Sequence, residues 1–369
     1  MKRFLIETMI FAVALFLLLE GVFRAVIPAC RMPFTGIEST FSLMSYASSA
    51  GMTGRYTFGR LAEIQSQWRI NNQGWNSNID YRPSAERTHP VIAVVGDSFI
   101  EALHVDADKN VAAVLQRLTG NRYDVYSFGM SAMPLSHLLQ MTRYISTMFD
   151  PDIIVYIVGS RSVVFSDPKS LFFKLTYSNG IFTESPPAGY HPSRLRRIAA
   201  YSAVVRYFTY NLGIERSAFF RRPAPQMVIR TEVGKKVSAG EKEKRIRYQE
   251  DLKRRTILQD RLIDYVIGAV QKLNGERRQI YVTTAVHRRM YKSGKPESDT
   301  AAEQFQHACT QHGIPFLNMA DPIYAWYTAH HKRLDFAVNR HWSESGHQAM
   351  AEIIYAELVK QGMIEENVR

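Results

Sequence analysis

Short apolar runs that alternate with helical patterns are the feature of this sequence that most constrains its fold. Residues 90–96 and 152–159 are runs of strand length in which apolar residues follow one another almost without interruption, and residues 123–128 read as a further strand. Strands of this kind are typical of a sheet that is covered on both faces. The segments between them carry apolar residues at helical spacing, over 111–118 and again after Pro134. This β-α-β-α-β order predicts a parallel sheet with helices on both faces.

The same alternation returns in the last third of the chain. The expected elements are a helix at about 251–273, a strand at 279–285, a helix at about 300–311, a strand at 314–319 and a last helix at 345–360. In the first half, Asp106 or Asp108 can cap the helix over 111–118. Active sites in such folds lie beyond the carboxyl ends of the strands. Candidate functional residues should therefore follow Gly96, Phe128 and Val158.

The first thirty residues contain an apolar segment long enough to cross a membrane. As a helix with a rise of about 1.5 Å per residue, residues 4–27 can span a hydrocarbon core of roughly 30 Å. Lys2 and Arg3 precede this segment, which places the N-terminus inside and the rest of the chain outside the cytoplasm. A cleaved signal peptide is the alternative. Because no clear A-x-A cleavage site follows, we favour a membrane anchor over residues 1–28.

Charge and cysteine content exclude several classes of function. Lys and Arg outnumber Asp and Glu by 46 to 34, and this net charge of +12 favours an acidic partner. The predicted topology argues against nucleic acid, because the domain would lie outside the cytoplasm. Cys30 and Cys309 are the only cysteines, and the sequence has no CxxC pair, no metalloprotease histidine spacing and no glycine-rich phosphate loop. We therefore expect neither a metal nor an organic cofactor.

Two segments fall outside the regular alternation. Residues 29–88 are rich in Ser, Gly, Asn and Arg, and we expect an irregular lead-in that packs on the α/β domain at 89–362. Residues 165–250, approximately, form a basic and aromatic insertion with proline-rich interruptions. Its basic side chains form either the solvated surface of a small subdomain, or a groove wall for an acidic glycan, or a contact with anionic lipid.

A serine follows the first predicted strand, in the sequence GDSF at residues 96–99. At the start of a helix its hydroxyl faces the edge of the sheet, where unpaired backbone N–H groups can bind a developing oxyanion. Alternatively, Asp97 or Ser98 only caps the helix. The loop that precedes the last helix, at residues 339–347, lies at the same edge, and His341 in this loop is the candidate base for Ser98.

These two segments resemble the first and last motifs of the SGNH (GDSL-type) hydrolases, a family of flavodoxin-like α/β serine esterases and acyltransferases. GDSFIE at residues 96–101 is similar to the family's GDS block, which carries the nucleophile, and HWSESGH at 341–347 is similar to its HW…GH block, which carries the base. The resemblance covers roughly residues 89–164 and 255–360. It implies a flavodoxin-like, three-layer α/β/α domain with a parallel sheet. A short anchor ending in LLLE is also common in membrane-tethered bacterial members.

Three positions depart from the family pattern. The second block of the family contributes a glycine N–H to the oxyanion hole, and Gly129 and Ala132 are the two candidates for that position. In the third block, G-x-N-D, Arg161 stands in place of the asparagine that donates to the oxyanion. The aspartate expected two or three residues before the base is absent. Asn339 can orient the imidazole but cannot stabilise its charge, and Asp335 approaches only if the loop doubles back.

The resemblance implies a serine esterase or O-acyltransferase, with Ser98 as nucleophile, His341 as base and Asn339 as the residue that orients the base. The candidate oxyanion-hole donors are Ser98, Gly129, Ala132 and Arg161. The expected substrate is an ester-linked acyl group, acetyl by preference, on a cell-surface polysaccharide or exopolysaccharide. The domain would face the periplasm or the cell exterior from a single-pass anchor in the bacterial inner membrane. The alternative is a catalytically degenerate domain that binds polysaccharide or docks with exopolysaccharide assembly proteins.

Overall fold

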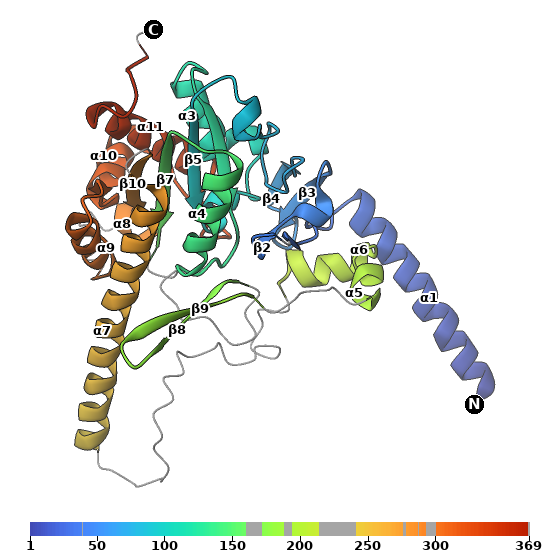
Figure 1. Ribbon diagram of the computed structural model, residues 1–369. Coiled ribbons are helices and arrows are strands. Elements are labelled where there is room, and N and C mark those ends of the chain that lie inside the picture. The colour runs from blue at the N-terminus through green and yellow to red at the C-terminus, as the bar shows by residue number, and fades with distance from the viewer. Residues whose placement is uncertain are drawn as a thin grey trace.

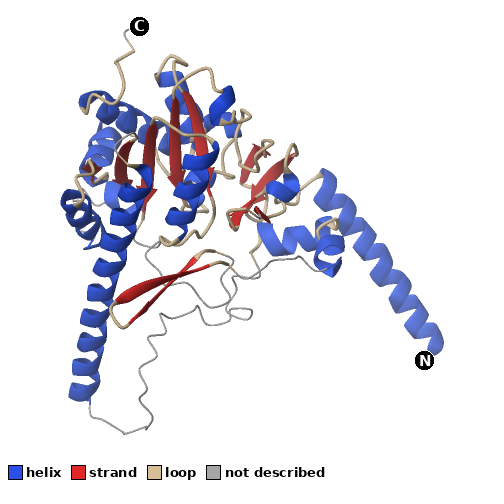
Figure 2. Ribbon diagram, viewed as in Figure 1, coloured by secondary structure: helices blue, strands red, loops and turns tan. Residues whose placement is uncertain are grey.

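The computed structural model describes residues 1–38, 40–159, 172–187, 194–213, 241–275, 278–286, 288–292 and 300–367. At its centre is a five-stranded parallel sheet (Figures 1 and 2) with the strand order β11-β10-β7-β5-β6. The strands are β5 (Val91–Gly96), β6 (Asp124–Gly129), β7 (Ile153–Val158), β10 (Gln279–Thr284) and β11 (Phe316–Leu317). Numbered along the chain, this order is 2-1-3-4-5, the flavodoxin-like order of a doubly wound sheet. The predicted α/β/α fold with a parallel sheet is therefore confirmed.

Helices cover both faces of this sheet (Figure 2). Successive residues of β5 point to opposite faces, so that Val91, Ala93 and Val95 lie in one apolar core and Ile92 and Val94 in the other. The first core is closed by the helices α4 (His137–Met148), α7 (Glu241–Asn274) and α9 (Thr300–Gln311). The second core is closed by α3 (Val111–Leu118), α8 (Arg288–Lys292), α10 (Ala320–His330) and α11 (Glu344–Lys360). Burial on both faces explains why the central strands are apolar throughout.

The cap of α3 differs from the prediction. Asn110 caps this helix, and its side-chain oxygen accepts the N–H of Ala113 at 2.9 Å. Asp106 instead accepts the N–H of Gln67 at 2.7 Å, and Asp108 lies in the short 3₁₀ turn η3 (Ala107–Lys109). The extra turn before α3 thus moves the cap from the predicted aspartates to the next polar residue.

Other elements differ in length or lack a sequence prediction. Helix α7 starts at Glu241, well before the expected position at about 251, and β11 contains only two residues. Helices α8 and α10 follow β10 and β11 without a predicted counterpart. In α10 the buried residues Ala320, Ile323 and Trp326 follow a helical spacing, but aromatic residues on its other side obscure this pattern in the sequence.

The lead-in is more regular than expected. It contains two antiparallel strand pairs, β1 (Gly36–Glu38) with β2 (Leu43–Ser45), and β3 (Thr53–Phe58) with β4 (Ile64–Arg69). Three aromatic residues join it to the α/β core: Trp68 and Trp75 are buried there, and Tyr81 stacks on a tyrosine of β6 with ring centroids 4.2 Å apart. The lead-in therefore lies against the edge of the sheet at β6 (Figure 1).

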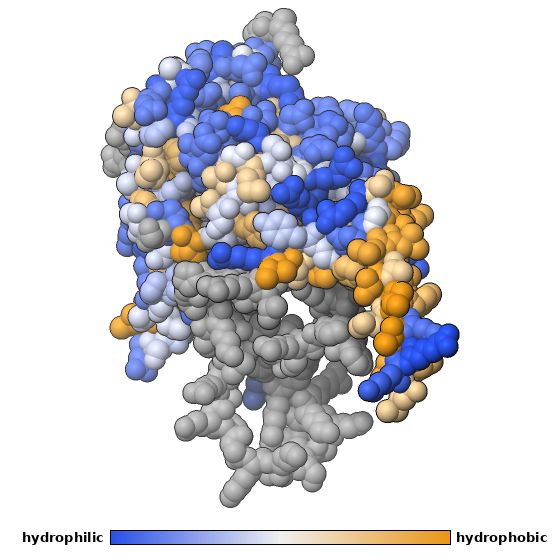
Figure 3. Space-filling model, turned by 90° about the vertical axis from the view of Figure 1, so that its right-hand side faces the viewer, coloured by the Kyte–Doolittle hydropathy of each residue, from blue (hydrophilic) through white to orange (hydrophobic). Residues whose placement is uncertain are grey.

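Helix α1 (Lys2–Ala25) projects away from the rest of the molecule (Figure 1) and its side chains are largely apolar (Figure 3). Among the described residues it is the one helix that is long and apolar enough to cross a membrane, a property that membrane anchors and signal sequences share. From the insertion, the structure describes the hairpin β8 (Lys174–Ser178) and β9 (Ile181–Ser185), and then α5 (Arg194–Ala199), α6 (Ala203–Arg206) and the π-helical turn η5 (Tyr207–Asn211). The last three elements lie beside the C-terminal end of α1 (Figure 1).

Candidate active site

Ser98 lies just beyond the carboxyl end of β5, as the first residue of the short helix α2 (Ser98–Glu101). A Cβ on Gly96 would lie 2.5 Å from a side-chain carbon of Ile100, so glycine permits the tight turn from strand to helix. Asp97 is the N-cap, and its side chain accepts the N–H of Phe99 at 3.0 Å. The capping role therefore falls to Asp97 and leaves the hydroxyl of Ser98, which is half-buried, available for other contacts.

His341 meets Ser98 at this edge of the sheet. Its Nε2 lies 2.9 Å from the Oγ of Ser98, although the two residues are 243 positions apart in the chain. The loop that carries His341 folds back on itself before α11, through an antiparallel bridge between Asp335 and Trp342. The structure thus brings together the two residues that the sequence proposes as nucleophile and base.

Asn339 determines which nitrogen of the imidazole carries a proton. Its Oδ1 lies 3.1 Å from the backbone N of His341 and 2.6 Å from Nδ1 of the same residue. A backbone N–H can only donate, so the atom that it faces must be the amide oxygen, and Nδ1 must then also donate. In the neutral ring, Nε2 is left as an acceptor that faces the hydroxyl of Ser98. This is the tautomer that a general base requires.

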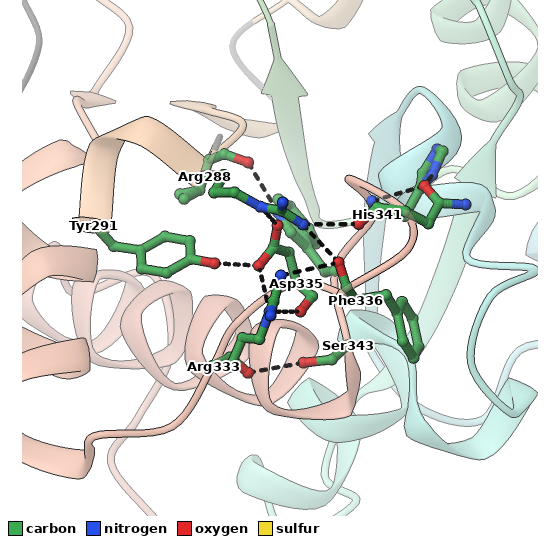
Figure 4. A network of polar contacts seen from close by, with 10 residues as sticks. Arg288, Tyr291, Arg333, Asp335, Phe336, His341 and Ser343 are labelled. Carbon is green, nitrogen blue, oxygen red and sulfur yellow. Dashed lines mark hydrogen bonds and ion pairs between the residues drawn. The ribbon is translucent and has the colours of Figure 1, made fainter. Parts of the chain in front are cut away.

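The loop does double back, yet Asp335 does not face the imidazole. Its carboxylate is almost fully buried and is bound by the guanidinium groups of Arg288 and Arg333 and by the hydroxyl of Tyr291 (Figure 4). Arg288 also donates to the carbonyl oxygen of Asn339 at 3.1 Å. Asp335 is therefore the centre of an ionic network that holds the loop of His341 in place, a role that its spacing in the sequence does not predict.

His104 packs flat on the ring of His341. The two ring centroids are 3.7 Å apart with an interplanar angle of 14°, and the His104 side chain is buried. Next to them, Trp342 stacks on Phe99 at 4.5 Å and donates its indole N–H to the carbonyl of Val286 at 3.0 Å. These contacts restrict rotation of the base. The one sequence signal for His104 is its position six residues after Ser98, which by itself predicts nothing.

The two candidates for the glycine of the second block have different surroundings. A Cβ on Gly129, at the end of β6, would lie 1.9 Å from the backbone nitrogen of Glu101, so this glycine lets α2 approach the strand. Ala132, three residues later, has a φ of +59°, the left-handed region that favours glycine. It is exposed, and no acceptor for its N–H is found among the described residues. Ala132 therefore has the backbone conformation expected of the glycine in the second block, and its N–H has no acceptor within the described part of the chain.

A buried carboxylate holds the loop that carries Ala132. Glu101 is 2% exposed, and it accepts hydrogen bonds from the backbone N–H of Ser131 at 3.0 Å, from the Ser131 hydroxyl and from the Tyr46 hydroxyl at 2.5 Å. Burial raises the pKa of Glu101, while these donors oppose the rise. Since Glu101 and Ser98 belong to the same turn of helix, the carboxylate fixes the spacing between Ser98 and Ala132.

The glycine and histidine that end the last motif, Gly346 and His347, are packed inside the protein. A Cβ on Gly346 would lie 2.1 Å from the carbonyl oxygen of Leu334, and His347 is 1% exposed beneath Trp342. Burial, and then the proximity of His341, lowers the pKa of His347 to about 3, so its imidazole is neutral. Arg161 lies outside the described residues. Within the described part of the chain, no group of three or more His, Cys, Asp or Glu side chains is placed to hold a metal ion.

The geometry supports covalent catalysis at an acyl carbonyl. A serine hydroxyl that donates to a correctly protonated imidazole can attack a carbonyl carbon, and the imidazole can hold the proton until the leaving oxygen needs it. The half-buried positions of Ser98 and His341 leave this pair accessible from solvent.

Comparisons with known proteins give structural likeness alone. No protein-family model and no curated protein matches the chain. Similar solved structures include an acetyl xylan esterase, with 10% identity, a TM-score of 0.39 and coverage of 73% of this chain and 99% of that chain. The lipase/acylhydrolase from Enterococcus faecalis has 9% identity and a TM-score of 0.38 over 76% and 100%. A carbohydrate acetylesterase from Sinorhizobium meliloti has 8% identity and a TM-score of 0.37 over 74% and 99%. Similarities at this level say nothing about what this chain acts on.

Proposed function

We propose that this protein is a membrane-tethered, SGNH-type serine esterase or O-acyltransferase that acts on ester-linked acyl groups. The observation that carries the proposal is the hydrogen bond of 2.9 Å between Ser98 Oγ and His341 Nε2, with Asn339 holding the imidazole in the tautomer of a base. A capping serine has no need of such a partner, and the cap at this helix is Asp97.

The reaction runs through an acyl-enzyme. The Oγ of Ser98 forms a bond to the acyl carbonyl carbon while its proton passes to Nε2 of His341. The tetrahedral intermediate collapses, the C–O bond to the leaving alcohol breaks, and His341 returns the proton to the leaving oxygen. Water or a second alcohol then attacks the acyl-serine in the same way, which gives hydrolysis or transfer.

The negative oxygen of the tetrahedral intermediate needs donors beside Ser98. The backbone N–H groups of Ser98 and Ala132 are the first candidates, because Ala132 has the left-handed conformation and its N–H has no acceptor among the residues that the structure describes. Gly129 serves the packing of α2 on β6, so we assign it a lesser part as a donor. Arg161 remains a proposed donor, either to the oxyanion or to an anionic part of the substrate.

The expected catalytic cost of Asn339 is moderate. Replacing the triad aspartate by asparagine in a serine protease costs about 10⁴ in rate because the imidazole adopts the wrong tautomer. Here the amide oxygen faces the ring, so the tautomer is correct and only the charge that stabilises the imidazolium is missing. A working but slower enzyme follows from this geometry.

The tether is supported by how the end of α1 is built into the domain. Phe23 stacks on Tyr207 with ring centroids 3.9 Å apart, and Glu20 accepts the N–H groups of Ala203 and Val204 at 2.8 and 3.1 Å. Removal of α1 as a signal peptide would leave the N–H groups of Ala203 and Val204 without the carboxylate that accepts them. Lys2 and Arg3, the first residues of α1, support an orientation with the domain outside the cytoplasm. We therefore propose a single-pass anchor in the bacterial inner membrane, with the domain in the periplasm or at the cell exterior.

The acetyl group and the polysaccharide rest on the resemblance to SGNH hydrolases and on the tether. We propose an acylated cell-surface polysaccharide or exopolysaccharide as substrate, and exopolysaccharide assembly proteins as partners. The tether would keep the site close to the membrane, where such polymers are exported and modified.

One observation favours a second function. The third position of the triad is a neutral amide, and the nearby carboxylate of Asp335 is bound by two arginines instead of the imidazole. A domain with such a site can bind an acylated polysaccharide, or dock with the assembly proteins, without turnover.

Turnover of p-nitrophenyl acetate by the full-length protein in detergent separates the two functions. An active esterase should release p-nitrophenol above background, and Ser98→Ala should lose this activity. Ser84→Ala, at an exposed serine in the 3₁₀ turn η2 (Ser84–Glu86), is the matched control and should retain it. Equal background from all three proteins would support the binding function.

A further inference from the structure

The free part of α1 is too short to cross a bilayer by itself. Residues 1–18 are exposed on all sides, but Leu19, Val22 and Phe23 pack against α6 and η5. The apolar stretch left for lipid, residues 4–18, is about 22 Å long at about 1.5 Å per residue. A hydrocarbon core of about 30 Å exceeds this length by roughly 8 Å. The segment packed around the C-terminal end of α1, from α5 to η5, can supply the remaining apolar length.

That surrounding segment exposes apolar side chains of its own. Between α5 and the residue after η5, five large apolar residues are exposed: one in α5, one in the turn that follows it, and three in or directly after α6 and η5. They are Ile198 (68% exposed), Tyr201 (71%), Val205 (40%), Phe208 (40%) and Leu212 (37%). In the same segment Ala203, Tyr207 and Asn211 are buried toward α1 and the lead-in. One side of the segment therefore packs against the protein, and the other side exposes apolar side chains.

Basic and aromatic side chains lie together at the C-terminal end of α1. Arg24, in the last turn of α1, binds Glu20 and donates to the carbonyl of Tyr201 at 2.9 Å. Its side chain stays 56% exposed, and Arg197 in α5 is also exposed. Arginine and tyrosine beside an apolar helix are typical of the boundary between headgroups and acyl chains, where basic groups attract anionic lipid.

From these observations we infer that residues 194–212 form an interfacial foot, which inserts the side chains of Ile198, Tyr201, Val205, Phe208 and Leu212 into the outer leaflet around α1. The inference rests on the tether in the proposed function. Helices that lie in an interface bury their apolar face by about 5–10 Å, and this depth matches the length that α1 lacks. The foot and α1 together fix the height and the orientation of the domain above the membrane.

Depth measurements on the full-length protein in vesicles of phosphatidylethanolamine and phosphatidylglycerol test this inference. Nitroxide labels are placed by Phe16→Cys on α1, by Tyr201→Cys and Phe208→Cys on the foot, and by Lys360→Cys at the far end of the domain. The native thiols Cys30 and Cys309 are buried and stay unlabelled. Collision rates with oxygen, which concentrates in lipid, and with a water-soluble nickel complex report the depth of each label.

We expect the oxygen-to-nickel ratio at positions 201 and 208 to be several-fold higher than at position 360, and lower than at position 16. A high ratio at position 16 with ratios at 201 and 208 equal to that at 360 would overturn the foot and leave the tether intact. A low ratio at position 16 would show that α1 is not in the bilayer, and would contradict both the membrane tether and the foot that depends on it. Esterase activity is measured on the same samples, so the chemistry is judged separately.

Discussion

The amide oxygen of Asn339 lies 2.6 Å from Nδ1 of His341, in the place where an aspartate would complete a triad. We expect Asn339→Asp to raise kcat/KM by about five- to tenfold, since a hydrogen bond to a charged group exceeds a neutral one by about 1–1.5 kcal/mol. Asn339→Ala should lower it. Steady-state hydrolysis of p-nitrophenyl acetate measures both, and an unchanged or slower Asn339→Asp variant would show that the amide does not act through the imidazole.

The left-handed backbone at Ala132 should make a substitution by glycine stabilising. An L-residue in this region carries roughly 1–2 kcal/mol of strain, against about 0.5–1 kcal/mol for the greater freedom of glycine in the unfolded chain. We therefore expect Ala132→Gly to raise the free energy of unfolding by up to about 1 kcal/mol. Ala113→Gly, inside α3, is the matched control and should lower it. Chemical denaturation of both variants compares the signs, and two losses would argue against strain at Ala132.

The buried carboxylate of Glu101 is proposed to position the Ala132 loop. Glu101→Gln keeps its size but presents an amide NH₂ to donors, so we expect kcat to fall by at least about tenfold with KM unchanged, as for an interaction made in the transition state. Tyr46→Phe removes one donor to the same carboxylate and leaves its contacts with Ser131. It should cost about 1–2 kcal/mol of stability while kcat is retained. Equal losses of kcat in both variants would point to a general structural role.

Two buried histidines should make the fold sensitive to acid. Burial lowers the pKa of His137 and of His347 to about 3, well below the ordinary 6.5 of the unfolded chain. The unfolded chain therefore binds protons first, and stability falls as pH drops from 6.5 toward 3. Between pH 7 and 5 each histidine should cost about 2 kcal/mol.

A variant at one of these histidines checks this sensitivity. His347→Asn should reduce the pH dependence by that amount. Denaturant midpoints at the two pH values measure the difference. Identical pH dependence in wild type and His347→Asn would contradict the burial argument.

Much of the fold follows from the sequence because strong local signals specify it. The continuous apolar segments that became β5 and β7 are buried on both faces, and their order with the intervening helices predicts the parallel sheet. The sequence pattern does not predict the strands of the lead-in, because contacts with the rest of the domain determine them. The strand pair of β3 and β4 depends on buried aromatics such as Trp68 packing on the domain, which a periodicity of a few residues does not reveal.

The candidate site was predictable to the extent that topology determines it. Ser98 and His341 each follow from a motif at the same edge of a parallel sheet, and the structure places them within hydrogen-bonding distance. His104, which stacks on His341, and Glu101, which holds the Ala132 loop, belong to no sequence motif. Their roles depend on how the loops fold over one another, so the sequence does not predict them. The direction of the Asp335 side chain could not be read from its spacing to His341 for the same reason.

Reaction of the full-length protein with a fluorophosphonate, followed by peptide mass spectrometry, shows whether Ser98 is an activated nucleophile. An activated serine forms a covalent phosphonyl adduct, so the account predicts a single modified residue, Ser98, and no adduct in Ser98→Ala or after replacement of the base by His341→Ala. An unmodified Ser98 in the folded wild-type protein, or equal labelling of wild type and Ser98→Ala, would contradict it.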